Sequence, residues 1–441
     1  MPTFGDSSKQ GTANMQLHNQ YNLHSHNVSS VANSDDSSAL DQVTNDSGDG
    51  LPVYGVTPQA YLMNGAANVS AAYGMMPQEY FMSDSGEVSP VSGATTYSAT
   101  TSSTTTAATW SPPPTLVGSP NGLQFDLTWD SSVVNAPPGF MQAVIDAAKY
   151  YTTLFSNKEV IAIDVGYGEI AGGPLDALSE SASYVYLTNY TTVTTALTSE
   201  GFTFSATNEP TSNPFLVTSA EAKTLGIPTA GGLDGYIGFY NLSGTAYSWN
   251  TAARTNGLNT GTGPNQFDLQ ADAEHEISEV MGRIGLEGGV TVNGHPAYTP
   301  LDLFNYQSPG VLELSANGGY FSVNDGWINL GNYNDAAVNG GDVADWASST
   351  SITQSNTLGL PRGSYDAYDA FAYPGYNGQV SLSDIIEDAA LGYKLAPTAN
   401  VALLANYMAS SFVGEASLHS AAVVQDAQEP NQQPLLSHPH A

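Results

Sequence analysis

The chain has 441 residues and a formal net charge of −33 at pH 7, with 8 Lys and Arg residues against 41 Asp and Glu residues. Nucleic acids and anionic membrane surfaces are bound by basic patches, so this composition argues against both kinds of partner. Cysteine is absent, which excludes disulfide bonds, zinc–thiolate sites and thiol nucleophiles. No apolar run approaches the roughly 18 residues of a membrane-spanning helix, so no membrane insertion is expected.

Residues 1–120 predict a low-complexity, largely disordered region that ends in a proline linker. Residues 1–110 contain one lysine and nine acidic residues among polar and Ser/Thr-rich runs. Such a segment has too few aliphatic side chains to form a core. Ser111-Pro-Pro-Pro114 is then typical of a stiff linker.

The two ends of the chain bear on where the protein acts. The N-terminus shows no basic segment followed by an apolar one, so no cleaved signal peptide is visible. The low lysine content, the lack of cysteine and the abundance of Gly, Ser, Thr, Asn and Asp resemble exported bacterial proteins that carry an uncleaved C-terminal signal. We therefore expect a secreted protein, with the cytosol as the alternative. Residues 396–441 predict one helix, over 401–412, and a polar tail as a possible export signal.

Residues 121–395 predict one folded domain. Alternation and β-branched runs predict strands over 123–129, 160–165 and 234–240. Apolar residues at helical spacing and a capping serine predict helices over 140–155, 185–199, 218–226 and 381–393. Strands and helices mix without strict βαβ alternation, which favours an α+β fold.

A further helix is predicted over 268–283, where His275 to Gly282 reads H-E-x-x-E-x-x-G. Positions i and i+4 of a helix share one face, so His275 and Glu279 can bind the same metal. Glu276 stands where the zinc-protease motif H-E-x-x-H keeps its general base. The alternative interpretation is a solvent-facing acidic helix turn.

A catalytic zinc site needs three protein ligands and one open position. Without cysteine, the third ligand must be His, Asp or Glu, and His295 is the only other histidine of the predicted domain. Asp302 is the first choice, because an unpaired carboxylate in the apolar frame Leu301-Asp-Leu-Phe304 would be costly; the alternative is a capping or turn Asp. His295 is the second choice, with a surface loop as its alternative. A carboxylate-rich set also admits calcium or manganese in place of zinc.

Two tyrosines and one arginine stand near these candidates in the sequence. Tyr298 or Tyr306 could donate a hydrogen bond to a developing oxyanion, although both also suit a buried core. Arg283 is interpreted as a structural ion-pair partner near the helix end. A carboxylate-bridged di-iron site needs Glu-x-x-His on two helices, and no such pair is present.

Several sequence blocks, in this order, resemble a family of secreted bacterial zinc metalloproteases with a zincin-like active helix. The resemblance covers about 121–395. The blocks are Gly122–Val133, Asp164–Ile170, Glu274–Arg283, Leu301–Val311, Tyr320–Val323, Gly341–Trp346 and Asp369–Phe371. It implies a mixed sheet with the active helix beneath its edge strand. It also implies a metalloendopeptidase that cleaves protein or peptide substrates, with Glu276 taking a proton from the attacking water.

The chain departs from the metzincins, whose helix reads H-E-x-x-H-x-x-G-x-x-H. Glu279 stands at their second ligand position and Gly285, which has no side chain, at their third. No methionine lies between Met281 and Met408, so their Met-turn is not evident. The alternative function is therefore a non-catalytic secreted adhesin or matrix protein that keeps a degenerate zincin-like site. The sequence indicates no oligomeric state.

Overall fold

A computed structural model describes residues 79–83, 88–90, 111–175, 177–254, 261–348, 365–397 and 399. Among these residues, no helix is both long and apolar enough to cross a membrane. The disorder expected before residue 79 and over 91–110, and the helix expected over 401–412, lie outside the described residues.

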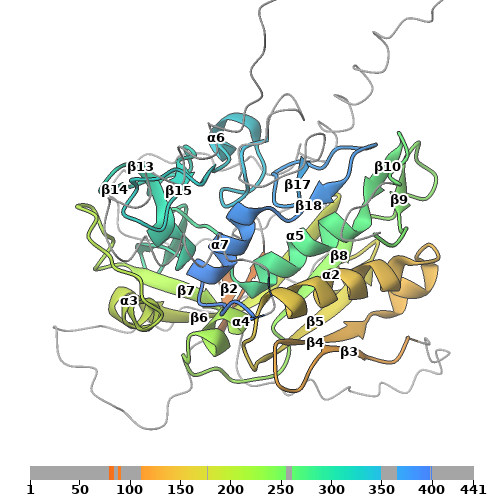
Figure 1. Ribbon diagram of the computed structural model, residues 1–441, viewed down its shortest axis with the longest axis horizontal. Coiled ribbons are helices and arrows are strands. Elements are labelled where there is room, and N and C mark those ends of the chain that lie inside the picture. Colours follow the sequence, from red (N-terminus) through yellow and green to blue (C-terminus); the bar gives the residue numbers. More distant parts are fainter. Residues whose placement is uncertain are drawn as a thin grey trace, which may run out of the picture.

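The centre of the molecule is a mixed eight-stranded sheet (Figure 1). Its order is β2-β1-β6-β8-β5-β4-β3, with β7 paired to β6 beside β8. The central strands β4, β5 and β8 run parallel, whereas β1, β3, β6 and β7 pair antiparallel with their neighbours. The strands are β1 (Glu79–Ser83), β2 (Val88–Pro90), β3 (Thr115–Gly118), β4 (Gln124–Trp129), β5 (Val160–Tyr167), β6 (Ser179–Asn189), β7 (Pro214–Thr218) and β8 (Gly235–Phe239). The α+β class is confirmed.

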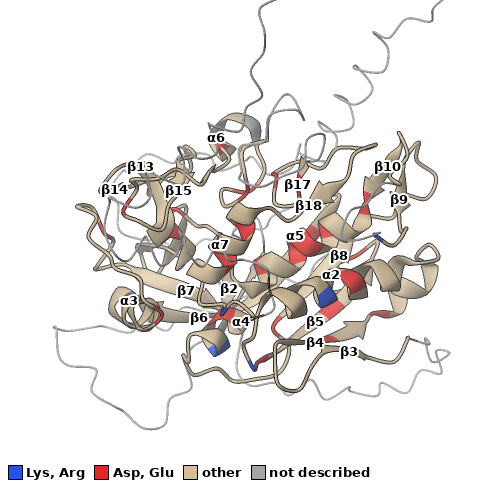
Figure 2. Ribbon diagram, viewed as in Figure 1, with Lys and Arg blue, Asp and Glu red and all other residues tan. Residues whose placement is uncertain are grey.

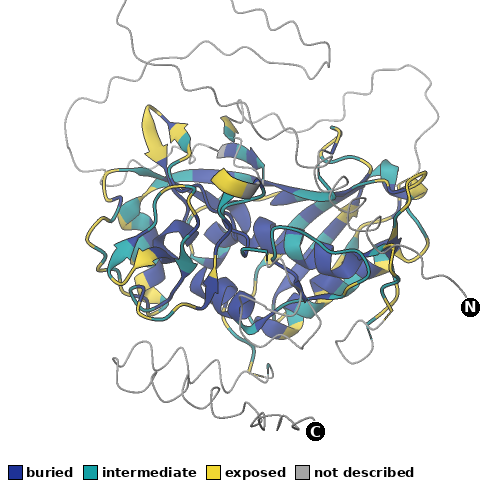
Figure 3. Ribbon diagram, turned by 90° about the horizontal axis from the view of Figure 1, so that it is seen from above, coloured by how far each residue is buried: buried dark blue, intermediate teal, exposed yellow. Residues whose placement is uncertain are grey.

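Two helices, α2 (Phe140–Leu154) and α5 (Leu269–Met281), lie side by side against this sheet. Helix α2 packs on β3 and β4, and α5 packs on β6 and β8. A Cβ atom on Gly235 would lie 2.9 Å from the Val280 side chain, so this glycine permits the close approach of α5 to β8. Figure 3 shows buried residues through the interior of the described part of the molecule and exposed residues at its periphery.

The sheet begins earlier in the chain than the sequence predicts. Strands β1, β2 and β3 all precede residue 121, inside the segment expected to be disordered or linker. In β1, Tyr80 and Met82 are buried and pack with Ile284 and Leu286 from the chain that follows α5. Alternate apolar residues in a short strand suffice here, because the edge of β6 supplies the backbone partners.

The helix predicted over 185–199 is wrong in its first part. Residues 185–189 complete β6, and helix α3 spans only Tyr190–Ser199. Val185 and Tyr186 pair with β1 on one side and β7 on the other, and this sheet pairing outweighs their helical spacing. Asn189 begins the helix, because its side chain accepts a hydrogen bond from the backbone N–H of Thr192.

The remaining elements are mostly short. Helix α7 (Leu382–Ala390) begins with a capping box between Ser381 and Asp384. The others are η1 (Ser131–Asn135), α4 (Ser219–Thr224), β9 (Ser248–Asn250), β10 (Gln266–Asp268), β11 (Val290–Val292), β12 (His295–Ala297), η2 (Leu301–Phe304), β13 (Asn305–Ser308), β14 (Val311–Leu312), β15 (Tyr320–Phe321), β16 (Gly331–Asn332), α6 (Ala336–Asn339), β17 (Tyr365–Asp366) and β18 (Gly378–Gln379).

Candidate metal centre

Helix α5 is enclosed by the protein, which contradicts the prediction of a solvent-facing acidic turn. Twelve of its 13 residues are buried, and His275 is the exception, with a side chain 14% exposed. The helix ends at Gly282, whose φ of 130° favours glycine and whose N–H donates to the carbonyls of Ser278 and Glu279. Figure 2 shows acidic residues along α5 and α7, in the middle of the molecule. Buried carboxylates at this density need partners.

Four charged side chains meet at one side of α5, and we call His275, Glu279, Arg283 and Asp345 the charge ring. His275 Nε2 lies 3.2 Å from Glu279 Oε1 and 3.3 Å from Asp345 Oδ1. The Arg283 guanidinium lies 3.3 Å from the same Glu279 oxygen and 2.7 Å from the same Asp345 oxygen. Each carboxylate therefore shares one oxygen between an imidazole and a guanidinium.

The orientation of both cationic groups is fixed by neighbours outside the charge ring. His275 Nδ1 lies 2.9 Å from the backbone oxygen of Ala367, which leaves Nε2 facing the carboxylates. Arg283 is 0% exposed, and its guanidinium lies 4.4 Å from the centre of the Tyr368 ring. Its Nε also donates to the Ser278 hydroxyl. The prediction that Arg283 is an ion-pair partner at the helix end is confirmed.

Charge within the ring determines the protonation of His275. Burial opposes the charged imidazole, but the Asp345 and Glu279 carboxylates outweigh it and raise the pKa of His275 well above its usual value. Burial likewise opposes the ionised form of Asp345, but His275 and Arg283 lower its pKa below the usual range. A metal that binds His275 would therefore have to displace a proton.

The residues present fit a divalent cation. Two overlapping sets, His275 with Glu276 and Glu279, and Glu279 with Asp342 and Asp345, each place one ligand atom per residue within 4.8 Å of the others. Glu279 belongs to both sets. Its Oε2 atom is buried and has no hydrogen-bond partner among the described residues, although Oε1 is used twice. A cation would satisfy this oxygen.

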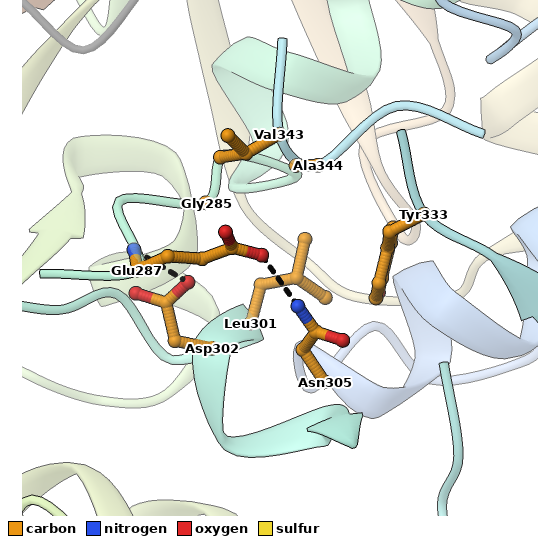
Figure 4. Close-up of a pocket in the computed structure, with 8 residues that line it drawn as sticks. All are labelled: Gly285, Glu287, Leu301, Asp302, Asn305, Tyr333, Val343 and Ala344. Carbon is orange, nitrogen blue, oxygen red and sulfur yellow. Dashed lines mark hydrogen bonds between the residues drawn. The ribbon is translucent and has the colours of Figure 1, made fainter. Parts of the chain in front are cut away.

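The structure does not bring Asp302 to His275 and Glu279. Figure 4 shows it in a separate crevice, where its carboxylate accepts hydrogen bonds from the backbone of Leu286, Glu287 and Thr299. The Thr299 N–H to Asp302 Oδ2 distance is 2.7 Å, measured between the heavy atoms. These bonds are those of the alternative prediction, a turn-capping aspartate, and Asp345 takes its place beside His275.

The other predicted site residues also lie elsewhere. His295 is exposed in β12, where it pairs with Val292 of β11. Tyr298 is buried and its backbone bonds to β7, through Pro214 and Leu216. Tyr306 is buried in β13 with its ring against Tyr320. These positions agree with the alternatives of a surface histidine and two core tyrosines.

Sequence reasoning missed Asp342 and Asp345. Both stand in the Gly341–Trp346 block, which was noted for its resemblance and not for its ligands. The loop is held in place by Trp346, which is 0% exposed, donates to Asp384 and stacks on Tyr333. No periodic pattern links this loop to α5, so only the fold brings Asp345 to His275.

Searches against protein-family models, curated proteins and solved structures found no match for this chain. The function must therefore be argued from the chemistry of the site itself.

Proposed function

We propose that this protein is an exported, zincin-like metalloendopeptidase whose general base and two of whose three metal ligands are carried by α5. The observation that carries the proposal is the convergence of His275 Nε2 with the Glu279 and Asp345 carboxylates, next to Glu276. The packing of α5 against β6 and β8 of a mixed sheet supports it further. The low lysine content and the absence of cysteine support export.

His275, Glu279 and Asp345 would hold the cation, because both carboxylates lie within 3.3 Å of His275 Nε2. Asp342 groups with Glu279 and Asp345. One nitrogen and two carboxylate ligands suit zinc, and the high share of oxygen also admits manganese or calcium. When bound, such a cation supplies a Lewis acid that polarises a peptide carbonyl and makes water a stronger nucleophile. Asp345 replaces Asp302 as the third ligand in this proposal.

Glu276 is the general base of the proposed reaction. It is buried, and it offers a carboxylate oxygen within 4.8 Å of ligand atoms from His275 and Glu279. From there it would accept a proton from the attacking water and return it to the leaving amine. The buried setting favours such transfers, because few waters compete for the proton.

The test combines metal content with cleavage of an unfolded substrate such as reduced casein. We expect about one zinc per chain and a fall in cleavage of about 10²–10⁴-fold in Glu276→Gln, with zinc retained. Glu221→Gln is the matched control, because it makes the same change at a fully buried carboxylate of α4. Protein that takes up no zinc and cleaves nothing would overturn the proposal.

The second candidate function is a non-catalytic secreted adhesin or matrix protein. The observation that favours it is Arg283, whose buried guanidinium contacts both Glu279 and Asp345. With His275 protonated, two positive groups balance two carboxylates, and the charge ring is neutral without a metal. Retention of the fold with no metal under zinc saturation would support this alternative.

A further inference from the structure

Strand β1 covers the outer edge of β6, although the chain places it far from the rest of the sheet. Its five residues pair antiparallel with Ala182–Tyr186 of β6. β1 pairs on its other side with β2. In the sequence, the polar and Ser/Thr-rich segment 91–110 lies between β2 and β3. β1 therefore comes from the N-terminal region and completes an edge that belongs to the domain.

The side chains of β1 fill an apolar socket on the α5 side of the sheet. Met82, which pairs with Ser183, is 0% exposed, and Tyr80 pairs with Val185. Both belong to one buried cluster, and we call its other members the β6 socket: Val185, Leu216, Ile284, Leu286, Val292 and Ala297. Gly235 pairs with Ser183 and faces Val280 of α5, which assigns Met82 and Tyr80 to the same face as the helix.

The third central side chain of β1 points the other way. Phe81 packs edge-on against Tyr184 and Tyr236, at ring-centre distances of 5.6 and 5.7 Å. Recognition of β1 thus uses backbone pairing, two apolar side chains at alternate positions on one face and an aromatic side chain on the other. Any extended peptide with that pattern meets the same requirements.

The socket adjoins the candidate metal centre through the chain itself. Ile284 directly follows Arg283 of the charge ring, and its carbonyl accepts a hydrogen bond from the Thr299 hydroxyl. Helix α5 packs on β6, the strand that β1 covers. A peptide on this edge would run beside the end of the helix that carries His275 and Glu279.

We propose that residues 79–83 are a displaceable strand, and that the β6 edge with its socket accepts an extended peptide with apolar residues at alternate positions. The link to substrate access depends on the proposed peptidase function; the strand exchange does not. In this arrangement β1 occupies the edge of β6 and prevents another peptide from pairing there. An intramolecular strand competes at an effective concentration on the order of millimolar, so an added peptide binds poorly until β1 is weakened.

The experiment uses the full chain and a fluorescein-labelled peptide with the sequence of residues 78–91, followed by fluorescence anisotropy. We expect Met82→Asp to bind the peptide at least ~10-fold more tightly than the unaltered chain, since the buried charge expels β1. Val117→Asp is the matched control, because Val117 is similarly buried in β3 at the opposite edge of the sheet. It should bind the peptide no better than the unaltered chain.

Met82→Ala keeps the test valid if Met82→Asp does not fold, because it only shortens the side chain. We expect Met82→Ala also to bind the peptide more tightly than the unaltered chain. Equal peptide binding by the unaltered chain and a folded Met82 variant would overturn the exchange. Casein cleavage tests the link to activity: we expect a several-fold rise in the Met82 variant. Equal, non-zero cleavage would overturn that link, whereas peptide binding without any cleavage would count against the proposed function alone.

Discussion

The buried carboxylates of the charge ring and those of the crevice in Figure 4 have different partners. In the charge ring, Glu279 and Asp345 lie against His275 and Arg283. In the crevice of Figure 4, Asp302 accepts hydrogen bonds from the backbone N–H groups of Leu286, Glu287 and Thr299. There Glu287 accepts from the Asn305 amide, and burial together with the Asp302 charge raises its pKa to about 10.

This difference separates candidate ligands from structural acids. A carboxylate that lies against cationic side chains can exchange those contacts for a metal. A carboxylate bonded to backbone N–H groups supports a turn, and one that keeps its proton is neutral. The charge ring also differs from the buried Arg254–Glu274 pair, because a histidine contacts both of its carboxylates.

Of the substitutions that test this difference between the charge ring and the crevice, removal of Arg283 should change the free energy of unfolding most. Arg283→Met leaves Glu279 and Asp345 with one cation between them, and we expect a loss of about 3–5 kcal/mol in the free energy of unfolding without metal. If the charge ring is a metal site, zinc should restore much of that loss by occupying the vacated position. Urea unfolding with and without zinc measures both values.

Arg254→Met is the control for this prediction. Arg254 is also a buried arginine, paired with Glu274 of α5 at 2.9 Å, and Glu274 lies outside both candidate ligand sets. We expect a comparable loss of stability that zinc does not restore. Equal rescue of both variants, or of neither, would remove the distinction between the charge ring and an ordinary buried ion pair.

The next largest expected effect is on zinc affinity, and it tests whether Asp345 or Asp302 is the third ligand. Asp345→Asn should lower zinc affinity by at least about 100-fold, because loss of a ligand should cost no less than the roughly 10–100-fold known for residues that only orient ligands. Asp302→Asn should leave zinc affinity unchanged and cost about 1–3 kcal/mol, because backbone N–H groups lose part of their acceptor. Competition with a chromophoric chelator measures the affinities, and the opposite ranking would restore Asp302 as the ligand.

Glu287 provides a pH test of the crevice. Its folded pKa of about 10 lies above the ordinary value of 4.5, so the folded state binds the extra proton and loses stability as pH rises between those values. Glu287→Gln removes this dependence, and its stability relative to the unaltered chain should rise on the order of 1 kcal/mol per pH unit. If the free energies of unfolding of Glu287→Gln and the unaltered chain change equally between pH 5 and pH 8, Glu287 is not buried as a neutral acid.

The sequence predicted local features better than contacts across the fold. Helices α2, α5 and α7 lie where apolar spacing and caps put them. The i, i+4 rule brought His275 and Glu279 together, because a helix fixes that distance by itself. Asp345 could not be found this way: it reaches His275 only because Trp346 is buried against Tyr333 and α7. β1 was not predicted for the same reason, because its partner strand β6 lies about a hundred residues further along the chain.

Substitution of His295 should have the smallest effect on stability and zinc affinity, and it tests the remaining candidate for the third ligand. It is exposed in the β11–β12 hairpin, so His295→Ala should change the free energy of unfolding by no more than about 0.5 kcal/mol. Zinc affinity should stay equal to that of the unaltered chain, in contrast to Asp345→Asn. A fall in zinc affinity would mean that the hairpin closes over α5 when metal binds. Asp345 would then belong with Asp302 among the structural acids, and His295 would supply the third ligand.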